Sequence, residues 1–540
     1  MRAAPRSRLL DLDELLARAG GSAGGVPDGV AEDLAARLFA ELTSQLPDVP
    51  AALLESSDHA RTTQPARSAY SILAFSFGPQ AATVSHSRGQ MSVRDDGGAS
   101  RHRQPFFDWL AENWPIGQGF GGPAQADAPR FALGWVGWLG YELKREAGSP
   151  DRIEDPAEPT ESASRSGDLP SEEASLFRAT HAVVIHHHRG QLELQCLEAD
   201  TMGDWEERVT GSLAGLPRRP TAPGGSHGSD GSEDPDAEGA ASEQRDVLRE
   251  AAVRDSRSAY LAAIAQAKRE ITAGNSYEIC LTTAITGTLT PGSARGVEVF
   301  SALRARNRAP FTAFLSIGET EILSTSPERF LSISSSGKVR SEPIKGTRPR
   351  GSTEAQDQAL VEDLRTHPKD RAENVMIADL VRNDLSIHAV PGSLRTERLC
   401  AVETYPTVHQ LVSTISAQLP KHTSRARVVA DAFPPGSMTG APKISTMEIL
   451  QRLETGARGP YSGVAGYFSL NGASDLAVLI RTVVLSGSPE ARRFHLGLGG
   501  AITADSEPAE EWEEVRTKSR GVLQALGAPF PEPAAAHREG

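Results

Sequence analysis

The segment Pro343-Ile344-Lys345-Gly346-Thr347 contains the residue whose type and setting best fit covalent chemistry. The chain has 56 basic residues, and only eight of them are lysines, so arginine fills most cationic positions. A lysine amine can lose its proton and act as a nucleophile, whereas an arginine guanidinium stays charged. Lys345, held in a turn between proline and glycine, is therefore a candidate nucleophile. The pentapeptide alone is equally consistent with an ordinary exposed lysine in a turn.

Three glutamates fall on two predicted helices and have the chemistry to bind a divalent cation. Proline favours the first turn of a helix, so we predict one helix over 368–383, which carries Glu373, and another from 508, which carries Glu511 and Glu514. A magnesium ion takes one or two protein carboxylates and completes its shell with water and substrate oxygens. Glu373 and Glu514 are therefore a candidate magnesium pair. Their spacing is also consistent with solvated acidic helix faces.

Two glycine-containing segments have a backbone that suits the close approach of an anion. Residues 436–443 form a predicted loop that opens a helix over 444–452, and the amides of a helix N-terminus favour negative charge. Residues 497–501 contain three glycines, which let a backbone come close to a ligand. Neither segment has the spacing of a Walker A loop or of a dinucleotide-binding loop. Both are equally consistent with structural turns.

Apolar periodicity and turn residues predict the elements that must position these side chains. A helix with apolar residues at helical spacing begins near 260 and stops at the glycine and asparagine of 274–275. Alternating and β-branched runs predict strands. These strands lie at 134–141, at 182–185 and 192–196 as a hairpin around Arg189-Gly190, at 279–283 and at 311–317.

Composition excludes several classes of protein. The 540-residue chain is 39% hydrophobic and carries a net charge of −14 without a basic stripe, which argues against a nucleic-acid groove. Three distant cysteines, Cys196, Cys280 and Cys400, form no CxxC pair, so they support neither a disulfide framework nor a zinc site. No apolar stretch is long enough to span a membrane, and acidic residues interrupt the N-terminal segment where a secretory signal needs an apolar run. We therefore expect a cytoplasmic protein with no nucleic-acid or membrane partner.

The motifs together resemble those of the chorismate-utilising enzymes, a family that includes component I of anthranilate synthase and of aminodeoxychorismate synthase, and the isochorismate and salicylate synthases. Eight motifs occur in the family order between about 250 and 525, and a looser similarity covers 50–147. The motifs lie at 326–330, 343–351, 370–374 with 379–385, 408–413, 434–443, 461–468, 480–482, and 504–506 leading to Glu514.

This resemblance implies an α+β fold, a sandwich of two large, mostly antiparallel sheets flanked by helices, with the active site between the two halves. Two segments rich in proline, glycine, serine and acidic residues are predicted to be disordered. The chain is accordingly divided into an N-terminal extension (1–29), an anthranilate-synthase-like region (30–216) with a disordered insert (148–175), a disordered linker (217–246), a chorismate-binding catalytic domain (247–527) and a C-terminal tail (528–540).

Within this family, Lys345 distinguishes between activities. Anthranilate synthases are similar but have alanine at this position, whereas aminodeoxychorismate synthases have the lysine and use it as a covalent nucleophile. The resemblance therefore implies that Lys345 adds at C2 of chorismate and expels the C4 hydroxyl, after which ammonia adds at C4 and expels the lysine. A nucleophilic amine must be neutral, so we expect burial, or a nearby Mg²⁺ or arginine, to lower the pKa of Lys345. Anthranilate synthase component I is the alternative activity.

The resemblance also implies roles for other side chains. Glu373 and Glu514 would bind Mg²⁺, and Glu511 would orient a metal-bound water or bind the ion itself. The residues implied to bind the substrate carboxylates are Arg481, Lys443, Tyr461, Gly499 and Gly500. Thr439 lies where the family discriminates at the ring. His409 is a candidate acid–base group near C4, and a packing or positioning role is an equally good interpretation.

One departure from the family pattern concerns the nucleophile. Isochorismate and salicylate synthases are similar but place a water-activating lysine where this chain has Glu278. A glutamate at this position disfavours water as the nucleophile. It therefore argues against an isochorismate synthase.

The source of ammonia is predicted by elimination. A fused glutaminase would need a nucleophilic cysteine in a Gly-x-Cys-x-Gly segment with a downstream His-x-Glu, and none of the three cysteines has this setting. We therefore expect a separate glutamine amidotransferase subunit as partner. No lyase domain follows the motifs, so release of 4-aminobenzoate should need another enzyme. The sequence leaves open whether the product enters folate or a specialised metabolite, and what the oligomeric state is.

A second pocket is implied in the N-terminal half. The segments 53–56 and 307–311 resemble those that build the tryptophan pocket of the family. The residues of this possible tryptophan site are Glu55, Ser56, Asn307, Pro310 and Phe311. A packed core between the sheets is the alternative interpretation. A catalytically silent, tryptophan-binding regulatory subunit is the alternative function, and the intact Lys345, Glu373, Glu514 and Arg481 argue against it.

Overall fold

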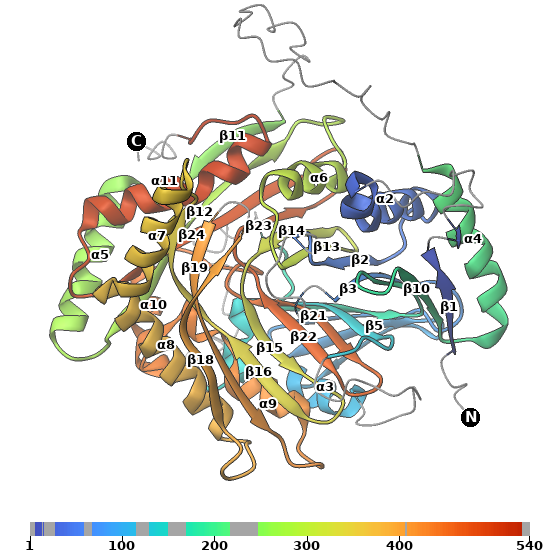
Figure 1. The fold of residues 1–540 in the computed structure, drawn as a ribbon, viewed down its shortest axis with the longest axis horizontal. Coiled ribbons are helices and arrows are strands. Elements are labelled where there is room, and N and C mark those ends of the chain that lie inside the picture. The colour runs from blue at the N-terminus through green and yellow to red at the C-terminus, as the bar shows by residue number, and fades with distance from the viewer. Residues whose placement is uncertain are drawn as a thin grey trace, which may run out of the picture.

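The strands of the protein pair into two 12-stranded sheets that pack face to face (Figure 1). The computed structural model describes residues 6–12, 14–15, 28–58, 67, 69–114, 129–149, 169–216, 247–405 and 408–531. Neighbouring strands run antiparallel in both sheets. The predicted α+β sandwich is therefore confirmed.

The first sheet carries β12, the strand that begins at Glu278, near one edge. Its order is β1 (Arg6–Asp11), β10 (Gln191–Cys196), β9 (His181–His186), β3 (Tyr70–Phe75), β2 (Ala51–Glu55), β13 (Phe311–Ile317), β14 (Thr320–Ser326), β23 (Thr482–Ser486), β24 (Arg493–Ile502), β12 (Glu278–Leu289) and β11 (Leu248–Val253), with the short β20 (Gly440–Ala441) also paired to β12.

The second sheet carries the strand with the candidate nucleophile, β17, at its edge. Its order is β17 (Ile344–Pro349), β19 (Val408–Gln418), β16 (Lys338–Glu342), β15 (Arg329–Ile333), β22 (Ser474–Val478), β21 (Val464–Ser469), β7 (Gly134–Leu139), β8 (Ala174–Ala179), β4 (Thr83–Ser87), β5 (Gln90–Asp95) and β6 (Gly98–Arg103), with β18 (Arg395–Thr404) also paired to β19.

Buried apolar clusters show how the layers pack. One cluster lies between the sheets and takes side chains from β2, β3, β13 and β14 on one side and from β7, β8 and β21 on the other. The outer face of the first sheet packs against α2 (Asp28–Gln45), α4 (Met202–Gly215), α5 (Arg257–Thr272), α6 (Gly296–Arg306), α10 (Lys443–Leu453) and α11 (Pro508–Ala525). The outer face of the second packs against α3 (Phe106–Asn113), α8 (Pro368–Ser386) and α9 (Arg425–Ala432).

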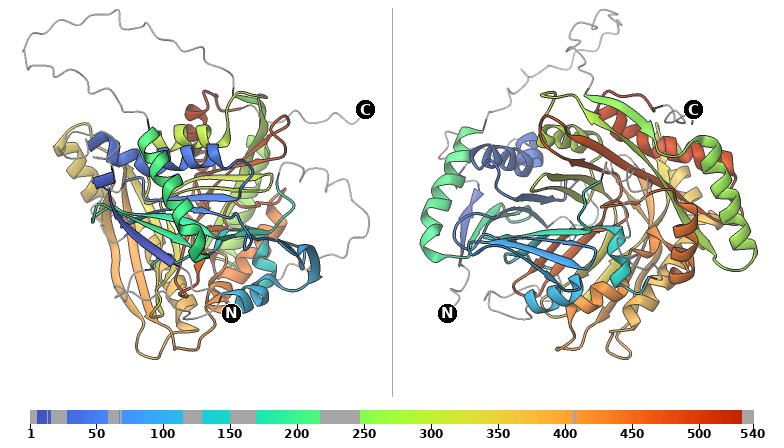
Figure 2. Two further views of the ribbon diagram at one scale, coloured as in Figure 1. Left: turned by 90° about the vertical axis from the view of Figure 1, so that its right-hand side faces the viewer. Right: turned by 180° about the vertical axis from the view of Figure 1, so that it is seen from behind.

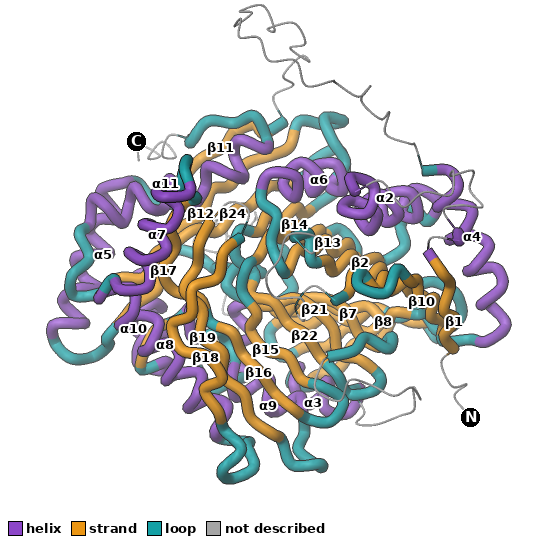
Figure 3. Tube along the Cα trace, viewed as in Figure 1, coloured by secondary structure: helices purple, strands orange, loops and turns teal. Residues whose placement is uncertain are grey.

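The helices therefore cover the outer faces of the two sheets (Figure 3). A further helix, α7 (Glu354–Thr366), packs against β17, β18 and β19. Helix α11 lies beside α5, as the view from behind shows (Figure 2). Helices α8 and α11, which carry the candidate metal ligands, thus belong to opposite layers.

Most elements predicted from local pattern are confirmed. Helices α5, α8, α10 and α11 cover the four predicted helices, and α8 and α11 each begin at the proline that predicted their start. The hairpin of β9 and β10 turns at Gly190, which has a φ of 60°. A left-handed conformation of this kind costs glycine little, because glycine has no Cβ.

The segment boundaries differ from expectation at two places. Residues 6–11 of the predicted extension form β1 and pair with β10 at the edge of the first sheet. The predicted insert ends too late, because β8 begins at Ala174, where the strand pairs with β7. Residues 150–168 of the insert, the whole linker 217–246 and residues 532–540 of the tail lie outside the described residues. Regions 30–216 and 247–527 contribute strands to both sheets, so the two regions share one sandwich.

Within the described segments, none of the helices combines the length and the apolar character that crossing a membrane requires.

Candidate active site

Lys345 and Glu278 form an ion pair that joins the two sheets. Lys345 is the second residue of β17 in the second sheet, and Glu278 is the first residue of β12 in the first sheet. The Lys345 Nζ donates a hydrogen bond to Glu278 Oε1. The side chain of Lys345 is 11% exposed and that of Glu278 is fully buried. The candidate nucleophile therefore points into the molecule and is not an exposed turn lysine.

The local backbone explains how Lys345 is presented. Gly346 has a φ of 86°, and a Cβ at this position would lie 3.0 Å from side-chain atoms of Asp370 and Leu364. Glycine is therefore needed after the lysine for both conformation and space. The strand can then bend past α8 while the lysine side chain turns toward the first sheet.

The protonation state of Lys345 differs from expectation. Burial by itself lowers the pKa of a lysine amine, but the negative charge of Glu278 outweighs it, and the pKa of Lys345 is raised. The expected lowering is therefore wrong for this arrangement, in which the raised pKa favours the ammonium form of Lys345. The other carboxylate oxygen, Glu278 Oε2, is buried without a hydrogen-bond partner among the described residues.

A second buried carboxyl, Glu328, faces the same region. Its Oε1 accepts a hydrogen bond of 2.6 Å from the Ser437 hydroxyl. Burial raises the pKa of Glu328 to about 7, although Ser437 and the Lys345 charge act in the opposite direction. A carboxyl that is half protonated near neutral pH can serve as a general acid.

The three candidate metal ligands lie on α8 and α11. Glu373 Oε1 is 4.0 Å from the Lys369 ammonium, and burial raises the pKa of Glu373 to about 7. Glu514 Oε1 is 2.8 Å from the Lys518 ammonium. Glu511 is buried, its pKa is raised by burial, and its Oε2 has no hydrogen-bond partner among the described residues.

The donor set is chemically suited to a hard divalent cation. In the described part of the chain no three acidic, histidine or cysteine side chains converge closely enough to hold a metal by themselves. The charge of Lys369 nevertheless acts on Glu373, Glu511 and Glu514, so the three carboxylates surround one region. Magnesium needs only one or two of them, with water and substrate oxygens completing the shell. The buried, unpartnered Glu511 Oε2 is an oxygen that a cation or its bound water would satisfy.

The Arg481 side chain has no hydrogen-bond or ion-pair partner in the part of the chain that the structure describes. The residue lies between β22 and β23 with a φ of 50°, and only its backbone oxygen is engaged, by Thr325. Burial lowers the pKa of the Arg481 guanidinium. No carboxylate pairs with this side chain among the described residues, which leaves its planar fork free for a bidentate anion.

The glycine strand β24 lies beside this cation and next to β12. A Cβ at Gly500 would lie 2.9 Å from Glu511 Oε2, so the glycine makes room for that carboxylate. The Gly499 carbonyl accepts a hydrogen bond of 2.8 Å from Lys518. The ring of Tyr461 packs over Gly497, where a Cβ would lie 2.1 Å from the ring. The structure thus places Gly499 and Gly500 against α11, and Tyr461 against Gly497 of the same strand.

Lys443 is placed differently from expectation. Its Nζ donates hydrogen bonds of 2.7 Å to Asp384 Oδ2 and 2.7 Å to the Ala432 carbonyl. This lysine therefore ties α10 to α8 and α9, and its role as a substrate ligand stays a prediction. Lys518, which the sequence did not single out as a substrate ligand, is the lysine beside the glycine strand.

Thr439 and His409 are both fully buried, and protein groups already occupy their polar atoms. The Thr439 carbonyl accepts a hydrogen bond of 2.9 Å from the Cys280 amide, which fixes the loop against β12. His409 Nε2 lies 2.9 Å from Asp357 Oδ1, and its Nδ1 lies 2.9 Å from the Thr404 hydroxyl. With both ring nitrogens engaged, this geometry favours the positioning role of His409 over the acid–base role.

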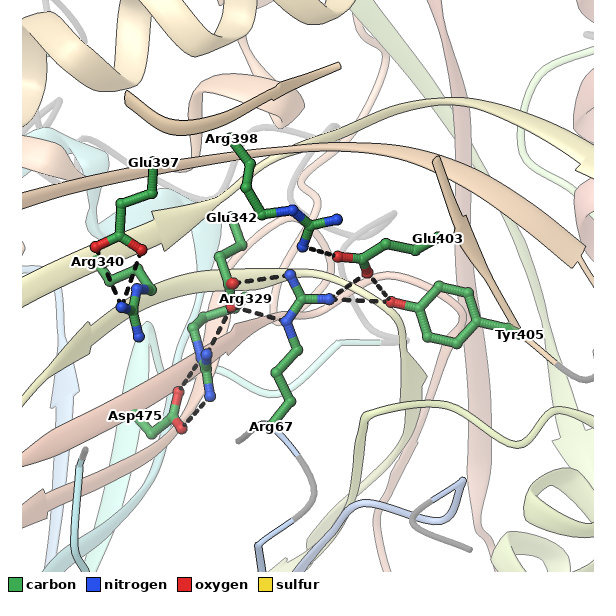
Figure 4. Close-up of polar contacts among 9 residues, drawn as sticks. All are labelled: Arg67, Arg329, Arg340, Glu342, Glu397, Arg398, Glu403, Tyr405 and Asp475. Atoms are coloured by element: carbon green, nitrogen blue, oxygen red, sulfur yellow. Dashed lines mark hydrogen bonds and ion pairs between the residues drawn. The ribbon is translucent and has the colours of Figure 1, made fainter. Parts of the chain in front are cut away.

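A network of buried ion pairs centres on Arg67, Arg329 and Glu342 (Figure 4). Arg67 donates to Glu342 Oε2 at 3.0 Å and Oε1 at 2.7 Å, and it also reaches Glu403. Arg329 donates to Glu342 at 2.6 Å and to both oxygens of Asp475 at 2.8 and 2.9 Å. These arginines hold the pKa of Glu342 down at about 2, although burial alone would raise it. The network fixes the strands that lead to the site.

The residues of the predicted tryptophan pocket lie where β2, β13 and the end of α6 meet. Glu55 Oε2 and Oε1 accept hydrogen bonds of 2.5 and 2.7 Å from Arg304. Thr312, which follows Phe311, pairs with Glu55 in the sheet, and Ser56 donates to Asp58 Oδ1 at 3.0 Å. The carboxylate of Glu55 is thus committed to an arginine of its own chain. Occupancy by tryptophan stays a prediction.

Glu328, Lys518 and Arg67 are residues that motif reasoning left without a role. Glu328 had a signal, because a glutamate among the small and apolar residues around β14 and β15 is costly to bury unless it is used. Lys518 had a weaker one, four positions after Glu514 on the same helix face. Arg67 had none, because its partners are remote in sequence.

Comparisons with known proteins identify the family of the chain. A family model described as chorismate binding enzyme matches residues 53–524. An aminodeoxychorismate synthase of Streptomyces griseus is 43% identical over 465 residues, which are 85% of this chain and 59% of that protein. Anthranilate synthase component 1 of Synechocystis sp. is 38% identical over 50% of this chain and 53% of that protein. The chain thus spans about three fifths of the length of the Streptomyces relative.

A solved structure shares the fold. The crystal structure of anthranilate synthase component I from Streptococcus pneumoniae TIGR4 is similar with a TM-score of 0.64 and 23% identity, over 84% of this chain and 92% of that chain. At this identity the likeness concerns the fold alone.

Proposed function

The chain belongs to the chorismate-binding enzymes, and from this membership we propose that it converts chorismate and ammonia to 4-amino-4-deoxychorismate, the reaction of an aminodeoxychorismate synthase. The observation that carries the proposal is the buried amine of Lys345. Similar anthranilate synthases have alanine at this position and so lack that amine. The product would lead toward 4-aminobenzoate and folate.

Lys345 would supply the covalent step. Its amine bonds to C2 of the ring, the ring double bond shifts, and the C4 hydroxyl leaves. A hydroxyl is a poor leaving group unless it takes up a proton, and Glu328 is a buried carboxyl with a pKa of about 7. Ammonia then bonds to C4 and expels the Lys345 amine. Two displacements return nitrogen on the face from which oxygen left.

The two carboxylates of chorismate would be bound on the first-sheet side of the site. Arg481 offers an unpaired guanidinium to one carboxylate, since charge-assisted bidentate pairs are strong and directional. Lys518, Tyr461 and the backbone at Gly499 and Gly500 line the same side. Lys443, Thr439 and His409 would hold the surrounding loops and strands.

Mg²⁺ would be held by Glu373 and Glu514, with Glu511 binding either the ion or a water on it. The ion supplies positive charge that orients a substrate carboxylate and stabilises charge developing in the reaction. Lys369 and Lys518, which face these carboxylates, would have to give way to the cation.

Ammonia would come from a glutamine amidotransferase, which we propose as a separate subunit acting with this chain. A cytoplasmic location is part of the same proposal, as is the possibility of tryptophan bound near Glu55 and Ser56. The product would need a lyase to release 4-aminobenzoate.

Anthranilate synthase component I is the second candidate, because its Synechocystis relative is 38% identical over half of this chain. Lys345 favours amination at C4 over this activity. Without the lysine amine, ammonia would attack C2 directly and the product would lead toward anthranilate.

The decisive experiment incubates the protein with chorismate, Mg²⁺ and an ammonium salt and identifies products by liquid chromatography and mass spectrometry, with and without an added lyase. We expect 4-amino-4-deoxychorismate, and 4-aminobenzoate only with the lyase. Lys345→Ala and Lys345→Arg should abolish this product, whereas Lys421→Ala, which changes an exposed lysine, should not. Anthranilate fluorescence without lyase, or full activity in Lys345→Ala, would contradict the proposal.

A further inference from the structure

We propose that Glu278 is a catalytic residue that takes the proton from Lys345, keeps it while the amine is bonded to the substrate, and returns it when the amine leaves. The inference rests on the proposed function and adds a residue to its mechanism. It resolves a conflict in the site, because a nucleophilic amine must be neutral while the structure holds Lys345 as an ammonium against a carboxylate.

The geometry of Glu278 suits proton storage. One of its oxygens, Oε1, already accepts a hydrogen bond from Lys345 Nζ. The other, Oε2, is buried and has no donor among the described residues, so it has an open lone pair in a side chain with 0% exposure. An ionised carboxylate that lacks such donors gains from becoming neutral. Proton transfer along the existing hydrogen bond therefore needs no movement of either backbone.

The backbone that carries Glu278 is fixed. Glu278 pairs with Ala441 of β20, and the next residues of β12 pair with β24 from Ile279 to Thr288. The amide of Tyr277 also donates to the Ala441 carbonyl at 2.7 Å. A base held in this way stays within hydrogen-bond distance of the amine through a catalytic cycle.

Other titratable groups near Lys345 are less suited to the task. Cys280 lies next on the same face of β12, and burial raises the pKa of its thiol, so it is neutral. Glu373 on α8 and Glu514 on α11 are the proposed metal ligands, and Glu328, between β14 and β15, must itself supply a proton to the leaving oxygen. Glu278 is the carboxylate that contacts Lys345 within the described part of the chain.

The proton balance closes with these groups. The Lys345 ammonium gives its proton to Glu278, the neutral Nζ bonds to C2, and the C4–O bond breaks as Glu328 protonates the leaving hydroxide to water. Ammonia then bonds to C4, and the C2–Nζ bond breaks with its electron pair returning to Nζ. Glu278 returns its proton to this amine, and the extra proton on the new C4 nitrogen restores Glu328. Chorismate and ammonia give 4-amino-4-deoxychorismate and water.

The test measures the covalent step without ammonia. Chorismate and saturating Mg²⁺ are mixed with protein, the reaction is quenched over time, and intact-mass spectrometry follows an adduct of chorismate less one water, mapped to Lys345 by peptide analysis. Glu278→Gln keeps the shape and an oxygen acceptor but cannot store the proton. We expect adduct formation in this variant to slow by at least about a hundredfold.

The matched control is Glu321→Gln. Glu321 is also a largely buried carboxylate paired with a cation, 2.8 Å from Arg492, and it lies on β14 outside the site. Its variant should form the adduct at the unmodified rate. Excess formate should restore part of the rate in Glu278→Ala by supplying a carboxylate, and should leave Glu278→Gln unchanged.

The outcomes separate this inference from the proposed function. An unmodified chain that forms no adduct would overturn both. An adduct in the unmodified chain that forms as fast or faster in folded Glu278→Gln would overturn only the role of Glu278, since the glutamate would then merely hold Lys345 protonated.

A measurement on the unmodified chain tests the proposal even if the Glu278 variants fail to fold. If the proton stays within the pair, the rate of adduct formation should not rise with pH between about pH 6 and about pH 9, because Lys345 never has to release its proton to solvent. A logarithm of the rate that rises with pH with unit slope over this range would contradict the proposal. Glu328 should produce only a descending limb.

Discussion

Arg67 and Glu342 form a bidentate ion pair that joins the two sheets, with hydrogen bonds of 3.0 and 2.7 Å. Arg67 precedes β3 of the first sheet, and Glu342 ends β16 of the second, three residues before Lys345. Both side chains are less than one tenth exposed, at 5% and 8%. The position of Lys345, the candidate nucleophile, is therefore tied to the N-terminal half of the chain through Arg67.

Replacing Arg67 should destabilise the protein strongly. Arg67→Met leaves the buried carboxylates of Glu342 and Glu403 short of a cation, and breaking such a pair costs about 3–5 kcal/mol. Urea unfolding measures the loss. The control Arg365→Met removes a cation that is 55% exposed and should cost about 0.5 kcal/mol or less. Equal small losses in the two variants would show that the network does not hold the sheets together.

Arg481 should control the binding of substrate. Arg481→Gln removes the guanidinium while keeping a polar side chain, and a charge-assisted hydrogen bond contributes about 1.5–3 kcal/mol, so KM for chorismate should rise about tenfold to a hundredfold. Arg481→Lys should recover part of the affinity, because it restores charge without the planar fork. Steady-state kinetics with ammonia measure KM for chorismate in both variants. An unchanged KM in both variants would remove Arg481 from the binding site.

Glu328 should set the alkaline side of the pH profile. A general acid must be protonated, and burial raises the pKa of Glu328 to about 7. The rate of adduct formation should therefore fall as pH rises through about 7. Glu328→Gln should lower the rate by about a hundredfold or more and remove this limb. A limb that persists in folded Glu328→Gln would assign it to another group.

His86 should make stability depend on pH in the alkaline range. Its Nε2 lies 3.0 Å from Glu146 Oε1 and its Nδ1 lies 3.3 Å from Glu173 Oε2. Burial opposes the charge, but the two glutamates prevail and raise the pKa of His86 to about 9. A pKa raised in the folded state gives stability that is fully present below about pH 6.5 and is lost as pH rises through about 9.

The free energy of unfolding should fall by about 3 kcal/mol, which is the rise in the His86 pKa multiplied by the free energy of one pKa unit. Urea unfolding of the unmodified chain and of His86→Gln at several pH values measures it: the variant should be less stable at low pH, and the two should converge above pH 9. His102→Gln, which changes an exposed histidine, should leave the pH dependence unaltered. A constant difference between His86→Gln and the unmodified chain at all pH values would contradict the charged state of His86.

Local signals in the sequence were sufficient for many elements. The prolines at 368 and 508 predicted the starts of α8 and α11, and the glycine at 190 predicted the turn between β9 and β10. These signals act within a few residues, because they fix single backbone dihedrals. The order of eight motifs predicted the family and, through it, the sandwich.

The sequence by itself therefore predicted which residues carry the chemistry, Lys345 first among them, and determined which fold presents them. Only the tertiary structure decided their partners. Lys345 meets Glu278 across 67 residues and two sheets, Lys443 turns to Asp384, and His409 has both nitrogens engaged. Protonation depends on burial and on charges within a few ångströms. Spacing along the chain does not contain those distances, so the paired ammonium of Lys345 became visible only when the two sheets were packed together.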